Sequence, residues 1–217
     1  MKKIGILGTG MVGNSIGTKL IELGYEVRMG SRTANNEKGM EWASRNGTLA
    51  STGTFSDAAS FGEMIVICTK GDATISVARS IKPDFVKGKT VIDISNPLDF
   101  SKGMPPFLTP EWSNTNSLGE EVQKVLPQAN VVKTLNIVNC QVMVNPDKVN
   151  GSHTMFVAGN NTEAKKQVTG ILEQFGWTDI IDLGDISSAR GMEMILPIWV
   201  RIMVSINNPH FGFKIVR

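Results

Sequence analysis

Short apolar runs alternate with amphipathic stretches along most of the chain. The first run, Ile4–Leu7, ends in glycines, which is typical of a buried strand. In Val12–Leu23 the apolar side chains recur three or four positions apart, and Gly24 follows at the usual stop position, so we predict a helix. A second strand is predicted at Glu26–Met29, and Met64–Thr69 is the clearest buried strand of the sequence.

The same rules predict the remaining elements. Further strands are expected at Thr48–Ala50, Thr90–Ile94, Val131–Leu135, His153–Ala158 and Asp179–Leu183. Further helices are expected at Glu37–Arg45, Phe55–Phe61, Ala73–Ile81, Leu118–Leu126, Thr162–Phe175 and Ser187–Ile206, the last of them bent or broken at Pro197. The segment 99–117 has three prolines and little periodicity, so we expect a functional or mobile loop there.

Strands that alternate with helices predict an α/β fold. We expect a Rossmann-like, doubly wound, mostly parallel sheet with helices on both faces and a short C-terminal helical extension. Residues 1–184 are predicted to form this domain, and residues 185–217 to add a helix and a tail that pack on it. We expect no separate substrate domain.

Composition narrows the class of protein. The 217 residues are 41% hydrophobic and 19% charged with a net charge of +2, which indicates a soluble globular protein. There is no basic run to bind nucleic acid, and the apolar stretch 192–207 is too short to span a bilayer. The start of the chain lacks a long enough apolar stretch for a signal peptide, and Cys68 and Cys140 are expected to be reduced thiols, so we predict a cytoplasmic location.

A glycine-rich loop carries the first chemical signal. The stretch GTGMVG matches G-x-G-x-x-G, follows the first predicted strand directly and opens the first predicted helix. Gly8 permits a tight turn, Gly10 lets the backbone approach a pyrophosphate, and Gly13 lets helix and strand pack closely. The helix start then offers free N–H groups to the phosphates, so the loop predicts dinucleotide binding.

The end of the second predicted strand indicates which dinucleotide. An acidic residue there would bind the ribose hydroxyls and repel a 2′-phosphate, but this chain has Ser31 and Arg32 instead. The Arg32 guanidinium can pair with a phosphate and the Ser31 hydroxyl can donate a hydrogen bond, so we expect NADP(H) rather than NAD(H). Arg28 and Lys38 are expected to add positive charge nearby.

Few ionisable residues are candidates for catalysis. Lys70 follows a predicted strand at its carboxyl end, where it could contact a cofactor phosphate or a substrate carbonyl, or remain solvated. Asp93 lies in a predicted buried strand and either bonds neighbouring backbone groups or takes part in the site. His153 and His210 have no second ligand at metal spacing, so we expect them to be structural or exposed and predict no metal.

Three features together resemble a known family. These are the glycine loop, the GSR after the second strand and the C-terminal segment SSARGMEMILPIWVRIMVSINNPHFGFKIV. They resemble the NADPH-dependent reductases of the deazaflavin coenzyme F-420, and the related domain of the STEAP metalloreductases is similar too. The resemblance covers nearly the whole chain and implies a Rossmann-like fold, NADP(H) across the carboxyl ends of the strands, a flavin-like partner in an adjacent cleft, and a homodimer.

The resemblance also implies roles for individual residues. Thr9, Met11 and Val12 would line the phosphate loop, Ser31 and Arg32 would hold the 2′-phosphate, Thr69 and Lys70 would run beside the ribose or nicotinamide, and Asn96, Pro97, Asn136 and Ile137 would approach the nicotinamide. Two positions depart from the reductases, which carry a Pro in place of Lys70 and a His in place of Asn136. Both departures lie near the expected pocket of the second substrate, so the acceptor stays open.

The expected function is that of an NADP(H)-dependent oxidoreductase. It would move a hydride between the nicotinamide and a small-molecule acceptor of the deazaflavin or flavin type. One alternative is a small imine or carbonyl reductase, for which Lys70 is the only candidate proton donor; another is a non-catalytic NADPH-binding sensor or partner subunit. The terminal helix is apolar nearly all round and should be buried on more than one side, against a second subunit or over the cleft.

Overall fold

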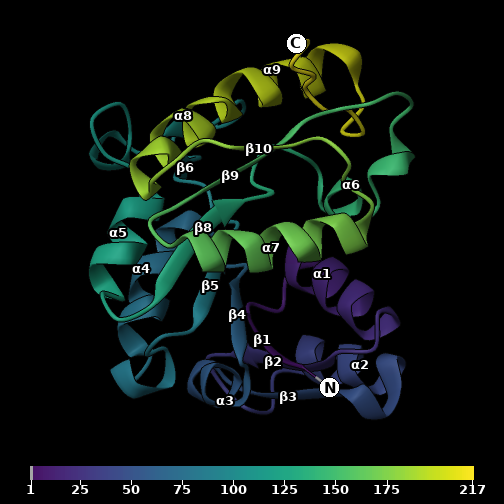
Figure 1. Cartoon of the computed structure of the whole chain (residues 1–217), viewed down its shortest axis with the longest axis vertical. Coiled ribbons are helices and arrows are strands. Elements are labelled where there is room, and N and C mark those ends of the chain that lie inside the picture. Colours follow the sequence, from purple (N-terminus) through teal and green to yellow (C-terminus); the bar gives the residue numbers. More distant parts are fainter. Residues whose placement is uncertain (1) are drawn as a thin grey trace.

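A twisted sheet with helices on both faces forms the centre of the molecule (Figure 1). The computed structural model describes residues 2–217. Its strands are β1 (Lys3–Leu7), β2 (Glu26–Ser31), β3 (Ala50–Thr54), β4 (Met64–Ile67), β5 (Thr90–Asp93), β6 (Leu98–Asp99), β7 (Phe107–Leu108), β8 (Asn130–Thr134), β9 (Met155–Gly159) and β10 (Ile180–Asp182). Its helices are α1 (Met11–Glu22), α2 (Glu37–Asn46), α3 (Phe55–Phe61), α4 (Gly71–Ser80), α5 (Leu118–Val125), α6 (Cys140–Val144), α7 (Thr162–Phe175), α8 (Ala189–Met194) and α9 (Leu196–Ile206).

The order of the strands is β10-β9-β8-β5-β4-β1-β2-β3. All neighbours are parallel except β8 and β9, which run antiparallel. The six strands from β3 to β8 therefore follow the doubly wound order that binds dinucleotides, and the winding changes direction between β1 and β4. This confirms the predicted Rossmann-like, mostly parallel α/β fold and marks the carboxyl ends of β1 and β4 as the place where a ligand groove opens.

Two apolar layers hold the helices against the sheet. On one face Ile4 and Ile6 of β1 belong to a buried cluster that continues through α1, α2 and α7. On the other face Leu7 belongs to a second cluster that includes residues of α3, α4 and α5. Because successive side chains of a strand point to opposite faces, the continuous apolar runs of β1, β4 and β5 fill both layers.

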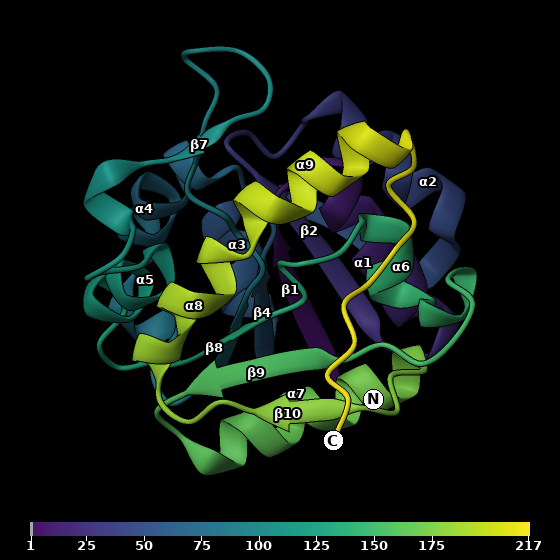
Figure 2. The same cartoon turned by 90° about the horizontal axis from the view of Figure 1, so that it is seen from above.

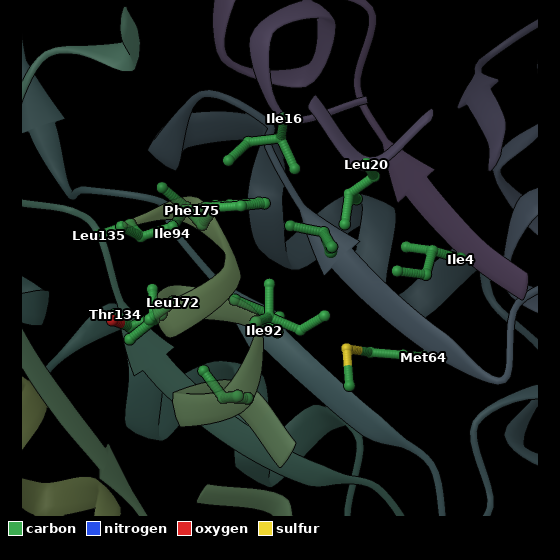
Figure 3. Close-up of a pocket in the computed structure, with 13 residues that line it drawn as sticks. Ile4, Ile16, Leu20, Met64, Ile92, Ile94, Thr134, Leu135, Leu172 and Phe175 are labelled. Atoms are coloured by element: carbon green, nitrogen blue, oxygen red, sulfur yellow. The ribbon is translucent and has the colours of Figure 1, made fainter. Parts of the chain in front are cut away.

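The interior of the first layer is closely packed (Figure 3). Side chains of Ile16, Leu20, Leu172 and Phe175 converge from α1 and α7 on those of the strands, and the void left between them is about 10 Å³. The Thr134 hydroxyl on its wall is already used, because it donates to the Phe156 carbonyl. This void is therefore a packing gap in an apolar core and offers no groups to hold a ligand.

The structure corrects three details of the predicted elements. Residues Gly47–Leu49 form a 3-10 turn, so the predicted strand Thr48–Ala50 is wrong and β3 begins at Ala50. This edge strand has only one buried residue, and its sequence ASTGT therefore shows little apolar alternation. Helix α6 lies in a segment for which no helix was predicted, and the predicted loop 99–117 contains β7, the second strand of a small hairpin with β6.

The terminal helix is broken near Pro197, which is one of the two outcomes predicted for it. α8 ends at Met194 and α9 begins at Leu196, so the break lies just before Pro197, which occupies the first turn of α9. Proline lacks the N–H that would bond four residues back and its ring crowds that carbonyl, which explains the break. No helix within residues 2–217 has the length and apolar character needed to cross a bilayer.

α8 and α9 lie along the carboxyl edge of the sheet (Figures 1 and 2). Only Leu196 and Val200 of α9 are buried, whereas Ile198, Val204 and Ile206 are each more than half exposed. The expectation that this helix is buried on more than one side is therefore not met within a single chain.

The chain after α9 runs back to the edge of the sheet formed by β9 and β10 (Figure 2). The Thr154 amide donates to the Phe213 carbonyl over 2.7 Å beside β9. Asp179 receives the Lys214 ammonium at 2.7 Å and the Arg217 guanidinium at 2.8 Å. The tail is thus attached by both backbone and charged side chains.

The close contact between β1 and α3 gives the first prediction. A Cβ at Gly5 would overlap the Ala58 carbonyl oxygen, whereas a Cβ at Gly170 in α7 would meet nothing within 4 Å. We expect Gly5→Ala to lower the free energy of unfolding by about 3 kcal/mol through overpacking. Gly170→Ala should raise it by roughly 0.5–1 kcal/mol, because alanine favours a helix. Urea denaturation checks both values, and equal effects of the two substitutions would contradict the prediction.

Candidate functional site

The glycine loop connects β1 to α1 at the point where the winding of the sheet changes direction. Gly10 caps α1 without a side-chain bond, and the first bond of the helix runs from the Asn14 amide to the Gly10 carbonyl at 2.9 Å. The N–H groups of the first turn therefore have no partner inside the helix. The Asn14 side chain donates to the carbonyls of Thr9 and Gly10, both at 3.1 Å, which turns these oxygens toward the helix.

The three glycines of the loop are needed for different reasons. Gly8 has φ of +129°, and a Cβ there would lie 2.7 Å from the Cys68 carbonyl oxygen. A Cβ at Gly13 would overlap the Gly8 carbonyl oxygen, so these two positions are restricted by the protein itself. A Cβ at Gly10 would meet nothing within 4 Å. Packing does not explain this glycine, but close approach of a ligand to the loop does.

A pocket of about 460 Å³ lies beside the end of β2. It is lined by Thr9, Ser31, Arg32, Thr33, Asn36 and Phe55. The Ser31 side chain is buried and bonds the backbone of Thr33, which shapes the turn after the strand. Arg32 is exposed on the pocket wall, and no carboxylate within residues 2–217 forms an ion pair with it. The pocket thus presents a free guanidinium.

The expectation for Arg28 is wrong. Its guanidinium lies over the Phe61 ring at 4.5 Å, and its Nε donates to the Ser51 hydroxyl at 3.2 Å. Alternate residues of a strand face opposite sides, so Arg28 does not join the pocket residues. Lys38 is exposed on α2.

A larger groove of about 1110 Å³ runs from the pocket along the carboxyl ends of β1 and β4. It brings together residues of the glycine loop, Ser31, Arg32, Phe55, Cys68, Thr69 and Lys70 with the first turns of α4. Thr69 is fixed by a 2.9 Å hydrogen bond between its hydroxyl and that of Thr74. Lys70 is exposed at the N-cap of α4 and its side chain supplies no cap. The groove therefore contains Lys70 and most of the predicted phosphate-side residues. Met11, Val12 and Gly13 do not line it, and Met11 is exposed to solvent.

Asn96 and Asn136 meet at the carboxyl ends of β5 and β8. The Asn96 amide nitrogen donates to the Asn136 carbonyl at 2.9 Å, and the Asn136 amide nitrogen donates to Oδ1 of Asn96 at 2.9 Å. Asn136 also donates to the Met192 carbonyl at 3.0 Å. Gly71 lets α4 approach this pair, because a Cβ there would overlap the Asn96 carbonyl oxygen.

One atom of this asparagine pair is left without a partner. Both contacts of the Asn136 amide nitrogen are acceptors, so the orientation of the amide is fixed and its Oδ1 remains a buried acceptor without a hydrogen bond. The preceding Leu135 has φ of +59°, which is unfavourable for a residue with a Cβ. Backbone strain next to an unsatisfied buried oxygen is typical of a position shaped for a ligand. Pro97 and Ile137, which flank the pair, are both buried.

A buried ionic cluster lies directly behind the asparagine pair. The Lys133 ammonium lies 3.0 Å from Oδ2 of Asp93 and 2.8 Å from Oε1 of Glu193, and it also donates to the Ser95 carbonyl. All three charged side chains are 0–1% exposed. Asp93 further accepts from the amide and the hydroxyl of Ser95. Asp93 was expected either to bond neighbouring backbone groups or to take part in the site. It bonds the neighbouring Ser95, and it also pairs with the charged Lys133.

Glu193 links this cluster to a helix. It accepts hydrogen bonds from the Leu118 amide at 2.8 Å and the Gly119 amide at 3.0 Å in the first turn of α5. Burial raises the pKa of Glu193, and Lys133 and the amides oppose that change. Burial would lower the pKa of Lys133, but the charges of Asp93 and Glu193 outweigh burial and raise it. The ammonium therefore keeps its proton.

Lys133 and Glu193 were not identified from the sequence as site residues. Both lie in elements that are otherwise apolar, Lys133 in a buried strand and Glu193 in the terminal apolar segment. A charge in such a place needs a partner of opposite charge. That rule identifies the three residues as candidates for pairing, but it does not say which of them meet.

The histidines lie away from the groove. His153 is buried and packs edge to face against Trp177, with ring centroids 4.9 Å apart. His210 is half-buried in the tail after α9. In the part of the chain that the structure describes, residues 2–217, no three His, Cys, Asp or Glu side chains group as metal ligands would.

Comparison with known proteins agrees with this geometry. The family model described as "NADP oxidoreductase coenzyme F420-dependent" matches residues 3–97. A crystal structure of a candidate F420-dependent NADP reductase from Arthrobacter sp. FB24 has a TM-score of 0.95 and 41% sequence identity, with both chains covered completely. The F420-dependent NADP reductase of Methanocaldococcus jannaschii is 29% identical over 161 residues, which are 73% of this chain and 70% of that protein.

A longer relative matches most of this chain. The metalloreductase STEAP3 of Rattus norvegicus is 27% identical over 201 residues, which are 91% of this chain but only 38% of that protein. This chain therefore spans well under half the length of that relative. Given the identity and complete coverage of the Arthrobacter protein, the chain belongs to the family of coenzyme F420-dependent NADP oxidoreductases, which are NADP-dependent oxidoreductases.

Proposed function

We propose that this protein binds NADP(H) along the groove and transfers a hydride between the nicotinamide and an acceptor of the deazaflavin or flavin type. The observation that carries the cofactor proposal is the pocket at the end of β2, where Ser31 and Arg32 stand in place of an acidic residue. A free guanidinium there suits a 2′-phosphate, whereas a carboxylate would repel it.

The rest of the groove is suited to the same cofactor. The open space above Gly10 and the free N–H groups of α1 would hold the pyrophosphate at the change of winding. In doubly wound sheets the second half of a dinucleotide lies over the strands beyond this point, which here are β4, β5 and β8. The nicotinamide would then lie beside Asn136, whose buried Oδ1 lacks a donor and could accept from the carboxamide.

The chain itself would supply orientation and a dry surface. Bound nicotinamide would carry the hydride. Asn96 and Asn136 offer amide groups, and the acids behind them, Asp93 and Glu193, are buried and already paired with Lys133. Hydride transfer to a flavin-type ring does not require a strong general acid from the protein, which supports this class of acceptor. Lys70 could contact a cofactor phosphate across the groove.

The cofactor proposal is tested at Arg32. Arg32→Ala should weaken NADPH binding about 10- to 100-fold, the effect of losing charge-assisted hydrogen bonds to a phosphate, and should leave NADH binding nearly unchanged. Calorimetric titration measures both dissociation constants. Arg45→Ala on α2 removes an exposed arginine outside the pocket and serves as the control. Equal loss of affinity for both cofactors would contradict the proposed role.

The acceptor proposal is tested with a panel of oxidants. NADPH oxidation should proceed with coenzyme F420 or with free flavins and not with imines or carbonyls. Lys70→Ala should keep the rate with the flavin-type acceptor within about threefold, because a general acid would contribute at least a hundredfold. Carbonyl reduction that is lost in Lys70→Ala would support the alternative reductase. Tight NADPH binding without turnover on any acceptor would support a sensor.

We further propose a homodimer formed through α9. The exposed Ile198, Val204 and Ile206 leave an apolar face on this helix, which a second copy of the chain would cover. Light scattering should give twice the chain mass of 23.5 kDa. Val204→Glu should give a monomer, and Met40→Glu on α2 should not. A monomeric wild-type protein at micromolar concentration would contradict the proposal. A cytoplasmic location stays a prediction.

A further inference from the structure

The cluster of Asp93, Lys133 and Glu193 has a formal charge of −1. Each carboxylate oxygen faces a donor: those of Asp93 face Ser95 and Lys133, and those of Glu193 face Lys133 and the amides of α5. Such surroundings fit two ionised carboxylates around one ammonium. Because the side chains are fully buried, water screens this charge little.

Two hydrogen bonds connect the cluster to the asparagine pair. Lys133 donates to the carbonyl of Ser95, and the peptide that follows this carbonyl carries the N–H of Asn96. Asn136 donates to the carbonyl of Met192, the residue before Glu193. The charge therefore lies next to the groups that would face the nicotinamide.

The charge of the cluster also acts on the groove wall. Cys68 lines the groove at the end of β4, beside the strand that carries Asp93. Burial and then the charge of Asp93 raise the pKa of the Cys68 thiol well above its usual value. The carboxylate of Asp93 is thus close enough to the groove wall to act on a group at the sheet edge where the cofactor is proposed to bind.

We propose that the buried cluster of Asp93, Lys133 and Glu193 selects the oxidation state of the bound cofactor by favouring NADP⁺ over NADPH. The inference rests on the proposed function. The two forms differ in that the oxidised ring carries a positive charge and the reduced ring none. Contacts with phosphates, ribose and adenine are common to both, so they cancel in the ratio of dissociation constants. The cluster would thereby favour hydride transfer from NADPH to the acceptor.

The expected effect is large enough to measure. At an effective dielectric constant of about 20, a unit charge changes the energy of a second charge by about 1.4 kcal/mol even at ~12 Å. That energy corresponds to a tenfold change in a binding constant. Partial positive charge at the start of α5 offsets some of the field, but it is the same in every variant compared.

The test compares variants that change the formal charge of the cluster with a variant that keeps it. The double variant Lys133→Met with Glu193→Gln removes one charge of each sign, so the formal charge stays at −1, and Asp93 retains its two bonds from Ser95. The triple variant that adds Asp93→Asn has no charge. Removing Lys133 alone would leave two buried carboxylates without a counter-ion and destabilise the fold, so that single variant is not used.

Calorimetric titration of each full chain with NADP⁺ and with NADPH gives the readout. The triple variant should raise the ratio of the NADP⁺ to the NADPH dissociation constant about tenfold, and the double variant should leave it within about twofold of the wild type. Glu163→Gln removes an exposed negative charge on α7 and should leave the ratio unchanged.

Each outcome has one meaning. A triple variant with an unchanged ratio, or a double variant that shifts the ratio as much as the triple variant does, would overturn the inference. Loosened packing alone weakens the binding of both cofactors alike and therefore leaves the ratio unchanged. A folded wild-type protein that binds neither NADP⁺ nor NADPH would overturn the proposed function itself. Should the triple variant fail to fold by circular dichroism, Glu193→Gln alone changes the charge by the same amount and is held to the same tenfold expectation.

Discussion

The ammonium of Lys133 holds together parts of the molecule that are far apart in the sequence. It joins the ends of β5 and β8 through Asp93 and Ser95, and it joins both strands to α8 through Glu193. Glu193 in turn caps the N-terminus of α5 by accepting hydrogen bonds from its first two amides. A buried charge is stable only when all its hydrogen bonds are made, so these four elements have few ways to arrange themselves other than the one seen. The asparagine pair is positioned as a result.

The fold could be predicted from the sequence because its signals are local. The run from Met64 and the spacing in Val12–Leu23 each identify an element, and alternation of strand and helix leads to the doubly wound sheet. The elements that were predicted wrongly or missed lack such signals. The edge strand β3 is mostly polar, and α6 is only five residues long, too short for a periodic pattern.

The candidate site also has a part that local sequence signals predict and a part that they do not. The phosphate side is built from contiguous stretches, and the groove brings the glycine loop together with Ser31 and Arg32 as their spacing suggests. The far side is built from pairs such as Asn96 with Asn136 and Asp93 with Lys133, each 40 residues apart. Spacing along the chain carries no information about such pairs, because they depend on β5 and β8 being neighbours in the sheet. The family resemblance implied that Asn96 and Asn136 both lie near the nicotinamide, but not that they bond to each other.

The attachment of the tail has a consequence for how a second substrate reaches the cofactor. α9 follows α8, which is anchored by Glu193, and it is followed by a tail anchored at Thr154 and Asp179. Because α9 is fixed at both ends, it cannot move like a lid. Such a motion would break the ion pair of Glu193 with Lys133 or the bonds of the tail to Thr154 and Asp179. If the acceptor binds beside this segment, its own shape rather than a closing motion of the segment would decide what enters.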